Sequence, residues 1–300
     1  MEQIGRGLVL EPYFATVVLG GGLLLQAGSD EQKRTLLPKL AAGELMLAFA
    51  QAERQARFDL HDVAAKAEKA GKGWRISGEK AVVLHAAAAD KLIVSARTAG
   101  DRRDRDGIGL FVVDRDARGL TRRDYPTVDG LRASEVAFDG VEAEATLGEP
   151  GEGLAVVERV VEQAVAALCA EAVGAMQVLH DDTNDYLKTR VQFGRPIGQF
   201  QVLQHRMVDM FMEVEQSRSM MLLASLRLDE QDARERAKAV SGAKVQIGRS
   251  GRFVGQQSIQ LHGGMGMTEE LRVGHYFKRL AMIDLSFGDV DWHLKRFAAL

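Results

Sequence analysis

The sequence has a single cysteine, Cys169, among its 300 residues. An internal disulfide is therefore excluded, and neither a CxxC pair nor a Cys/His zinc-binding spacing is present. Cys169 lies in an apolar stretch of helical character, which favours a buried, unreactive thiol over a nucleophile. We expect no metal site.

The chain also lacks an excess of either charge and any long apolar run. Its formal net charge of -3 offers no basic surface for a nucleic-acid partner. The apolar stretch Phe14–Gln26 contains three glycines and no basic flank, and it is shorter than the roughly 18 to 20 residues that span a membrane. The sequence therefore predicts no membrane partner, and a reducing, cytoplasmic location is the default expectation.

The first part of the chain, residues 1–45, is predicted to be helical. Ser29 can cap a helix, and Gln32 stands three residues later, as in a capping box. From residue 46 to about 140 the pattern changes to short alternating or β-branched runs, which indicate strands. Four such runs are Trp74–Gly78, Lys91–Ser95, Ile108–Val113 and Ser134–Phe138.

The glycine-rich segment Gly148–Gly153 marks a change to long helices. Apolar residues recur at helical spacing in Leu154–Arg190, Val202–Leu228 and Ala233–Leu261, which indicates a helical bundle. We therefore expect an α+β protein with segregated layers: helices in 1–45, a β domain in 46–145 and a four-helix bundle in 150–300. The charged run Asp101–Asp106 is interpreted as a solvated hairpin turn.

Two motifs in the second half stand about sixty residues apart. The first runs from Arg190 through Phe193 and Gly194 to Gln201, and the second is Gln260–Met267 with adjacent Gly263 and Gly264. A Rossmann interpretation fails, because these glycines follow a helix and have the wrong spacing. In this order and at this spacing, the two motifs resemble the flavin-contacting motifs of the acyl-CoA dehydrogenase family.

The resemblance extends over the whole chain, from the later part of the family's N-terminal helical domain to the end of its C-terminal bundle. Helices that normally precede Met1 are missing, through either a natural truncation or a misplaced start. Further matching segments are Ala41–Leu45, Trp74–Lys80 and Phe138–Val141. Within the family, the small subunits of pimeloyl-CoA dehydrogenase-type enzymes are the most similar, on the segments Arg57–Leu60, Val82–His85 and His275–Arg279.

The resemblance implies FAD as cofactor, an acyl-CoA thioester as substrate and an electron-transfer flavoprotein or similar acceptor. In the family, FAD lies across a subunit interface, and these motifs contact the ADP part of the partner's flavin. The corresponding residues here are Arg190, Phe193, Gln201, Gln260, Gly263 and Gly264. An arginine suits a diphosphate because its donors are planar and charged, and glycines let the backbone approach phosphate oxygens. Taken singly, each motif could instead be a loop arginine or a glycine-rich helix end.

Other family positions have lost their usual side chains. Where the family has a threonine that bonds the flavin ring and a serine near the phosphates, this chain has Ala52 and Phe58. An aromatic residue beside the flavin is replaced by Val82, and a following threonine or serine by Leu84. The resemblance therefore implies a weakened flavin pocket in this chain.

The family's catalytic glutamate abstracts the proton α to the thioester carbonyl, and its position is occupied here by Phe287. Some members carry the base on the first long bundle helix, where this chain has Ala164. Glu162 and Asp289 remain as candidate bases. Helical geometry turns Glu162 away from the face of Ala164, and Glu171 shares that face but lies two turns further along.

Asp289 and Asp291 have a simpler interpretation as carboxylates at the start of a helix, which we favour. His262 is expected to pack or hydrogen-bond, and Met207, Met210 and Met212 are expected in the core.

Three hypotheses follow. The first is a small subunit that completes the flavin site of a base-bearing homologous large subunit. The second is a self-sufficient dehydrogenase with a relocated carboxylate, and the third is a flavin-free scaffold subunit.

Overall fold

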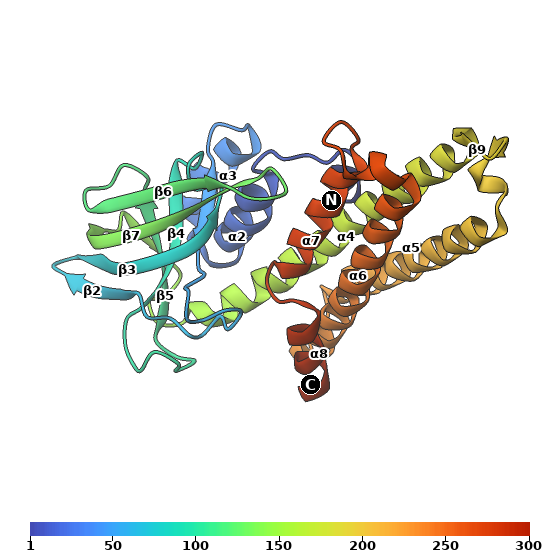
Figure 1. Ribbon diagram of the computed structural model, residues 1–300. Helices are drawn as coiled ribbons and strands as arrows, with labels where there is room; N and C mark the ends of the chain where they lie inside the picture. The colour runs from blue at the N-terminus through green and yellow to red at the C-terminus, as the bar shows by residue number, and fades with distance from the viewer. The chain divides into compact units, whose positions relative to one another are not determined.

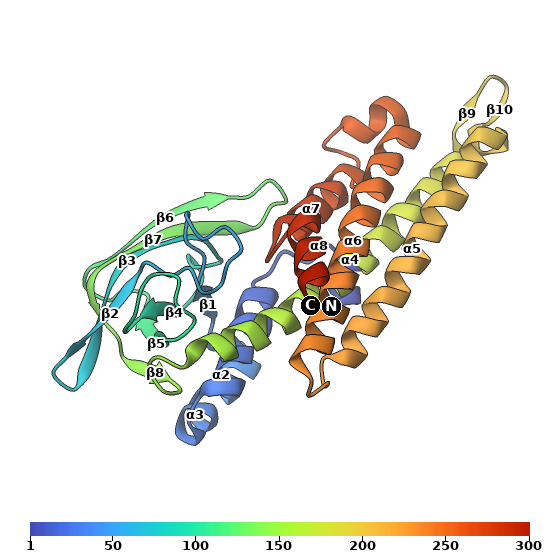
Figure 2. The same cartoon turned by 90° about the horizontal axis from the view of Figure 1, so that it is seen from below.

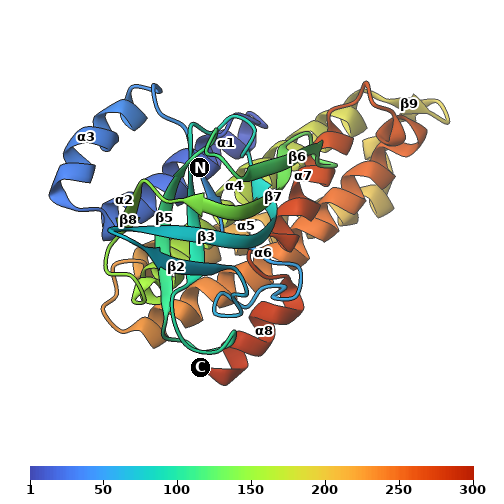
Figure 3. The same ribbon diagram turned by 90° about the vertical axis from the view of Figure 1, so that its left-hand side faces the viewer.

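The computed structural model describes residues 1–300. The first half of the chain forms one eight-stranded sheet (Figures 1 and 3). Strand order is β6-β7-β3-β2-β4-β5-β8, and β1 pairs in parallel with β4. The predicted strands are all present, with longer bounds. The strands are β1 Leu47–Ala50, β2 Lys66–Ala70, β3 Gly73–Leu84, β4 Lys91–Arg97, β5 Ile108–Asp114, β6 Leu120–Pro126, β7 Arg132–Glu142 and β8 Ala145–Leu147.

The sheet belongs to a unit of residues 10–164, which we call the β unit. Strands β4 and β5 are buried along almost their whole length, as their continuous apolar sequences require. Helical segments η1 (Phe14–Gly21), α2 (Gly22–Ala27) and α3 (Asp30–Ala41) precede the sheet. The predicted capping box is confirmed: Ser29 Oγ accepts from Gln32 N, and the Gln32 side chain accepts from Ser29 N.

Two buried cations fix the loops of the β unit. Lys80 Nζ lies 2.6 Å from Glu53 Oε1, and Glu53 also accepts hydrogen bonds from the backbone of Ala64 and Ala65. The Arg97 guanidinium donates only to backbone carbonyls, those of His61, Val63, Ala99, Arg102, Asp104 and Asp106. The exposed segment 101–106 joins the antiparallel strands β4 and β5, so the predicted hairpin turn is confirmed.

Residues 1–9 and 165–300 form a second unit, the helical unit. Its helices are α1 Glu2–Arg6, α4 Gly153–Thr189 (from Val165 on), α5 Gln201–Arg227, α6 Ala233–His262, α7 Val273–Leu285 and α8 Val290–Ala299. The long helices α4, α5 and α6 lie side by side in Figures 1 and 2. The three helices predicted from periodicity agree with α4, α5 and α6 to within one residue at each end. A hairpin of β9 (Val191–Gln192) and β10 (Arg195–Pro196) and the segment η2 (Ile197–Gln199) connect α4 to α5.

Close backbone contact places α1 on α4. A Cβ atom at Gly5 would overlap the Glu171 carbonyl, and one at Gly174 would overlap the Glu2 carbonyl, so both positions require glycine. The α4–α7 contact contains a buried ion pair, in which Arg279 Nε lies 2.5 Å from Glu171 Oε1. Cys169 is buried as predicted, and burial raises the pKa of its thiol to about 12.

The junction between α7 and α8 is held by a buried ammonium group. Lys244 Nζ, on α6, donates to the carbonyl oxygens of Asp284, Ser286 and Gly288 at 2.9, 3.0 and 2.6 Å. His293 Nε2 lies 3.1 Å from the Phe287 carbonyl oxygen. Phe287 and Gly288 both have positive φ, so these contacts hold an unfavourable turn in one conformation.

The buried His293 predicts a pH-dependent stability. Burial and the nearby charges of Lys244 and Arg296 lower the pKa of His293 to about 3, from an ordinary value of 6.5. Neutral His293 therefore contributes its full stabilisation of the fold above pH 6.5. This contribution is lost as the pH falls from 6.5 towards 3, because His293 binds a proton in the unfolded chain but not in the folded one. Between pH 7 and pH 5 the free energy of unfolding should fall by about 2 kcal/mol less in His293→Gln than in the wild type.

Urea denaturation at several pH values measures this difference. His205→Gln, at an exposed histidine of α5, is the matched control and should keep the wild-type pH profile. Parallel profiles for wild type and His293→Gln would show that His293 titrates normally in the folded protein.

Candidate functional site

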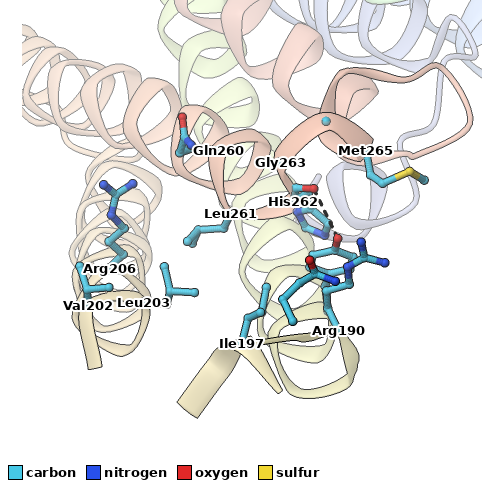
Figure 4. Close-up of a pocket in the computed structure, with 13 residues that line it drawn as sticks. Arg190, Ile197, Val202, Leu203, Arg206, Gln260, Leu261, His262, Gly263 and Met265 are labelled. Carbon is cyan, nitrogen blue, oxygen red and sulfur yellow. Dashed lines mark hydrogen bonds between the residues drawn. The ribbon is translucent and has the colours of Figure 1, made fainter. Parts of the chain in front are cut away.

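A pocket of about 630 Å³ lies where the end of α4, the start of α5 and the end of α6 come together (Figure 4). The structure brings four of the predicted cofactor residues to it: Arg190, Gln260, Gly263 and Gly264. The other lining residues are Tyr186, Gln192, Ile197, Val202, Leu203, Arg206, Leu261, His262 and Met265. Two motifs separated in sequence therefore form one site within the helical unit.

The pocket is positively charged. Arg190 and Arg206 line it, and no aspartate or glutamate does. The Arg190 side chain forms no hydrogen bond or ion pair, and Arg206 donates to the amide oxygen of Gln257 at 3.2 Å. Neither guanidinium is neutralised by a carboxylate, so the pocket is suited to an anion.

Glycine at the end of α6 opens the backbone to the pocket. The chain leaves the helix at Gly263 with φ 60° and ψ −140°, a conformation that essentially only glycine adopts. A Cβ atom at Gly263 or Gly264 would meet nothing within 4 Å, so the backbone there is accessible to a ligand. The segment continues as the short helix η3, Gly263–Met267.

His262 has the packing role that the sequence predicted. It is buried, its Nδ1 lies 2.7 Å from the Ser258 carbonyl oxygen, and its ring packs against Tyr186 with centroids 4.4 Å apart. The Tyr186 hydroxyl donates to the His262 carbonyl oxygen at 3.4 Å, the dashed contact in Figure 4. This pair links the ends of α4 and α6 and forms one wall of the pocket.

Two other predicted cofactor residues lie outside the pocket lining. Phe193, at the tip of the β9–β10 hairpin, is 91% exposed and has a positive φ. Gln201 is the first residue of α5 and is exposed. Their roles in cofactor binding stay predictions.

In the β unit, the positions expected near a flavin ring carry hydrocarbon side chains. Ala52 follows β1, and its carbonyl accepts from Ala81 N at 2.8 Å. Val82 is half exposed at a register shift between β3 and β7, with φ 52°. Leu84 ends β3, and Phe58 is partly buried in the loop that follows Glu53. None of these side chains can donate a hydrogen bond to a flavin.

Two carboxylates of the helical unit near the expected base positions have structural partners. Asp289 caps α8, since its Oδ1 accepts from Trp292 N at 2.8 Å, as the simpler interpretation expected. Glu171 is paired with Arg279. In the β unit, Ala164 and Glu162 are both buried in α4. No group of His, Cys, Asp and Glu side chains could hold a metal ion.

The methionine prediction was partly wrong. Met210 is fully buried, but Met212 is 48% exposed, because α5 carries apolar residues around more of its circumference than its neighbours cover. Sequence reasoning also missed Arg206, Tyr186 and Gln192 as pocket residues. Arg206 had a weak signal: it follows the apolar Val202 and Leu203 by one helical turn, on the helix that Gln201 begins.

Comparison with known proteins identifies the family. The models of the acyl-CoA dehydrogenase middle domain and C-terminal domain match residues 48–141 and 151–299. The probable acyl-CoA dehydrogenase YngJ of Bacillus subtilis (strain 168) is 31% identical over 295 residues, covering 96% of this chain and 77% of that protein. No helix of this chain is long and apolar enough to cross a membrane.

Two solved structures are similar over 99% of the chain. A variant of the steroid ACAD Tcur3481-Tcur3483 is 32% identical with a TM-score of 0.88, and 78% of that chain is covered. The FAD complex of PigA is 26% identical with a TM-score of 0.91, and 79% of that chain is covered.

The retained pocket fits the cofactor of this family, FAD. Its arginines and open glycine backbone suit the diphosphate, and its apolar side chains suit a planar base. When bound, the flavin of these enzymes accepts the hydride from the β carbon of an acyl-CoA. The sequence motifs, the fold and the relatives agree: the chain belongs to the acyl-CoA dehydrogenases, FAD-dependent oxidoreductases that act on the CH–CH bond of acyl-CoA thioesters.

Proposed function

We propose that this chain is the small subunit of a heteromeric acyl-CoA dehydrogenase and completes the flavin site of a homologous large subunit. One observation carries the proposal. Arg190, Gln260, Gly263 and Gly264 lie together in one pocket suited to an anion, whereas Phe287 stands where the resemblance places the catalytic base. A chain that keeps its contribution to a shared cofactor site and has no base of its own needs a partner that supplies the base.

The division of labour follows from side-chain chemistry. Removal of an α proton from a thioester needs a carboxylate beside the α carbon, and a phenyl ring cannot accept a proton. Asp289 accepts a hydrogen bond as the N-cap of α8, and Glu171 forms a buried ion pair with Arg279. Arg190 and the accessible backbone at Gly263 and Gly264 would bind the ADP part of the flavin. They would hold the cofactor without moving a proton.

The surface of α5 supports assembly with another chain. Its exposed large apolar side chains are Val202, Val208, Phe211, Met212, Leu222, Leu223 and Leu226. An exposed apolar surface of this kind marks an interaction site. Among the similar structures, the steroid ACAD is named for two components, Tcur3481 and Tcur3483, which is consistent with a two-component enzyme.

Three finer assignments complete the proposal. The substrate would be an acyl-CoA thioester, and the subunit would be of the pimeloyl-CoA dehydrogenase type that the segments Arg57–Leu60, Val82–His85 and His275–Arg279 resemble. Electrons would pass to an electron-transfer flavoprotein or a similar acceptor. The single, buried cysteine suits a reducing, cytoplasmic location.

The chain purified alone should retain little FAD and should not oxidise acyl-CoA. The reason is the absence of hydroxyl donors at Ala52 and Phe58 and of a carboxylate at Phe287 and Ala164. Flavin absorbance and turnover are measured for the chain alone and after co-expression with a base-bearing homologue encoded by a neighbouring gene. Stoichiometric flavin with turnover in the chain alone would favour a self-sufficient enzyme, and a flavin-free complex would favour a scaffold.

Arg190→Ala should weaken FAD binding in the assembled complex and leave the fold of this subunit intact. Loss of a charged contact to the diphosphate costs about 1.5 to 3 kcal/mol, which raises the Kd for FAD about ten- to hundredfold. Arg234→Ala, at an exposed arginine in the first turn of α6, removes the same charge away from the pocket and is the control. Equal FAD affinity in the two variants would contradict the role of Arg190.

Asp289→Asn should leave turnover of the complex nearly unchanged. Asparagine keeps the α8 cap, so the substitution removes only the ability to accept a proton. Replacing the glutamate at the base position of the large subunit should abolish turnover, as measured by reduction of an artificial electron acceptor. If Asp289→Asn removes most of the activity instead, this chain carries its own base.

A further inference from the structure

We propose that Arg206 of α5 is a second nucleotide-binding residue of the pocket and contacts the ADP part of FAD from the side opposite Arg190. The inference rests on the proposed function, because it concerns the same pocket. It adds a residue outside both sequence motifs and predicts that the pocket binds its ligand from two sides.

The first support is placement. Arg206 lies on α5 and Arg190 directly follows the end of α4. In Figure 4 the two side chains lie on opposite sides of the pocket, with Leu203, Leu261 and Ile197 between them. An apolar slot with a guanidinium at each side matches a nucleotide, which has a flat apolar base and an anionic diphosphate. Guanidinium groups also pack favourably on flat aromatic rings, so Arg206 can contact either part.

The second support is the orientation of Arg206. Gln257 stands on α6 almost one turn before Gln260, and its amide oxygen accepts one hydrogen bond from Arg206 Nη1. That contact leaves the other N–H groups of the guanidinium available to a ligand. Because Gln257 is neutral, it directs the side chain without cancelling its charge.

The third support is the charge of the surroundings. Exposed arginines of this protein commonly pair with carboxylates, as Arg272 does with Asp182, Arg105 with Glu158 and Arg54 with Glu135. Arg206 has no such partner, and neither has Arg190 on the opposite wall. Two like charges facing one pocket repel each other until an anion binds between them.

An alternative is that Arg206 only links α5 to α6 through Gln257. Variants separate the two roles. Arg206→Gln removes the charge and most donors, Arg206→Lys keeps the charge without the planar group, and Gln257→Ala removes only the helix–helix contact. Arg234→Gln is the control for loss of one positive charge outside the pocket.

The experiment measures the Kd of FAD for the apo form of the co-expressed complex, from the quenching of flavin fluorescence during titration. We expect Arg206→Gln to raise this Kd about tenfold. Arg206→Lys should have a smaller effect, and Gln257→Ala and Arg234→Gln should have little. The wild-type complex should release FAD when excess ADP is added, and the Kd for ADP of the apo complex should rise in Arg206→Gln by a similar factor to the Kd for FAD.

The outcomes separate this inference from the proposed function. If Arg190→Ala weakens FAD binding and Arg206→Gln does not, Arg206 is a surface residue and only the inference fails. If neither variant changes the Kd, the pocket is not part of the flavin site and both fail. If Gln257→Ala weakens binding as much as Arg206→Gln, the link between helices accounts for the effect and the inference is wrong.

Should no complex form, the pocket can be tested in the full chain alone, since all its residues come from one chain. Titration with ADP, followed by NMR chemical shifts, should then show binding that Arg206→Gln weakens and Arg234→Gln does not. Equal shifts in wild type and Arg206→Gln would overturn the inference.

Discussion

The turn between α7 and α8, which carries Phe287, depends on the buried ammonium group of Lys244. Burial lowers its pKa to about 8, and the carbonyl oxygens of Asp284, Ser286 and Gly288 compensate by surrounding it. A buried cation without partners would be costly, so the chain between α7 and α8 is forced to turn its carbonyls inward. The backbone at Phe287 is thereby fixed by residues other than Phe287 itself.

This arrangement shows how the fold of the family can persist when side chains in its loops differ. In the β unit, the Lys80–Glu53 pair and the carbonyl contacts of Arg97 hold the loops in the same way. The side chains at the positions expected near the flavin can then change while these buried cations hold the loops. Phe287 and Val82 both keep a positive φ despite bulky side chains, which indicates that the surrounding contacts determine the backbone there.

Much of the fold followed from the sequence, because its signals are local. Helical periodicity predicted α4, α5 and α6, and the Ser29–Gln32 pair predicted the start of α3. Part of the pocket also followed: four of its thirteen lining residues, Arg190, Gln260, Gly263 and Gly264, lie in the two motifs and were predicted as cofactor residues. Arg206 did not, because its role depends on which residues of α5 and α6 face each other, and no short motif records that. Met212 was wrongly assigned to the core because periodicity identifies an apolar face and not what covers it.

In a single chain, solvent weakens the electrostatic attraction of the pocket for an anion. Both arginines are exposed, so water screens their charges and weakens their attraction for a phosphate. A partner that covers the apolar surface of α5 would also exclude water from groups nearby, and the same charges would then act more strongly on the diphosphate. The diphosphate would neutralise the two guanidinium groups, and the partner would exclude the water that screens their charges. Cofactor binding and subunit assembly would therefore each increase the affinity of the other.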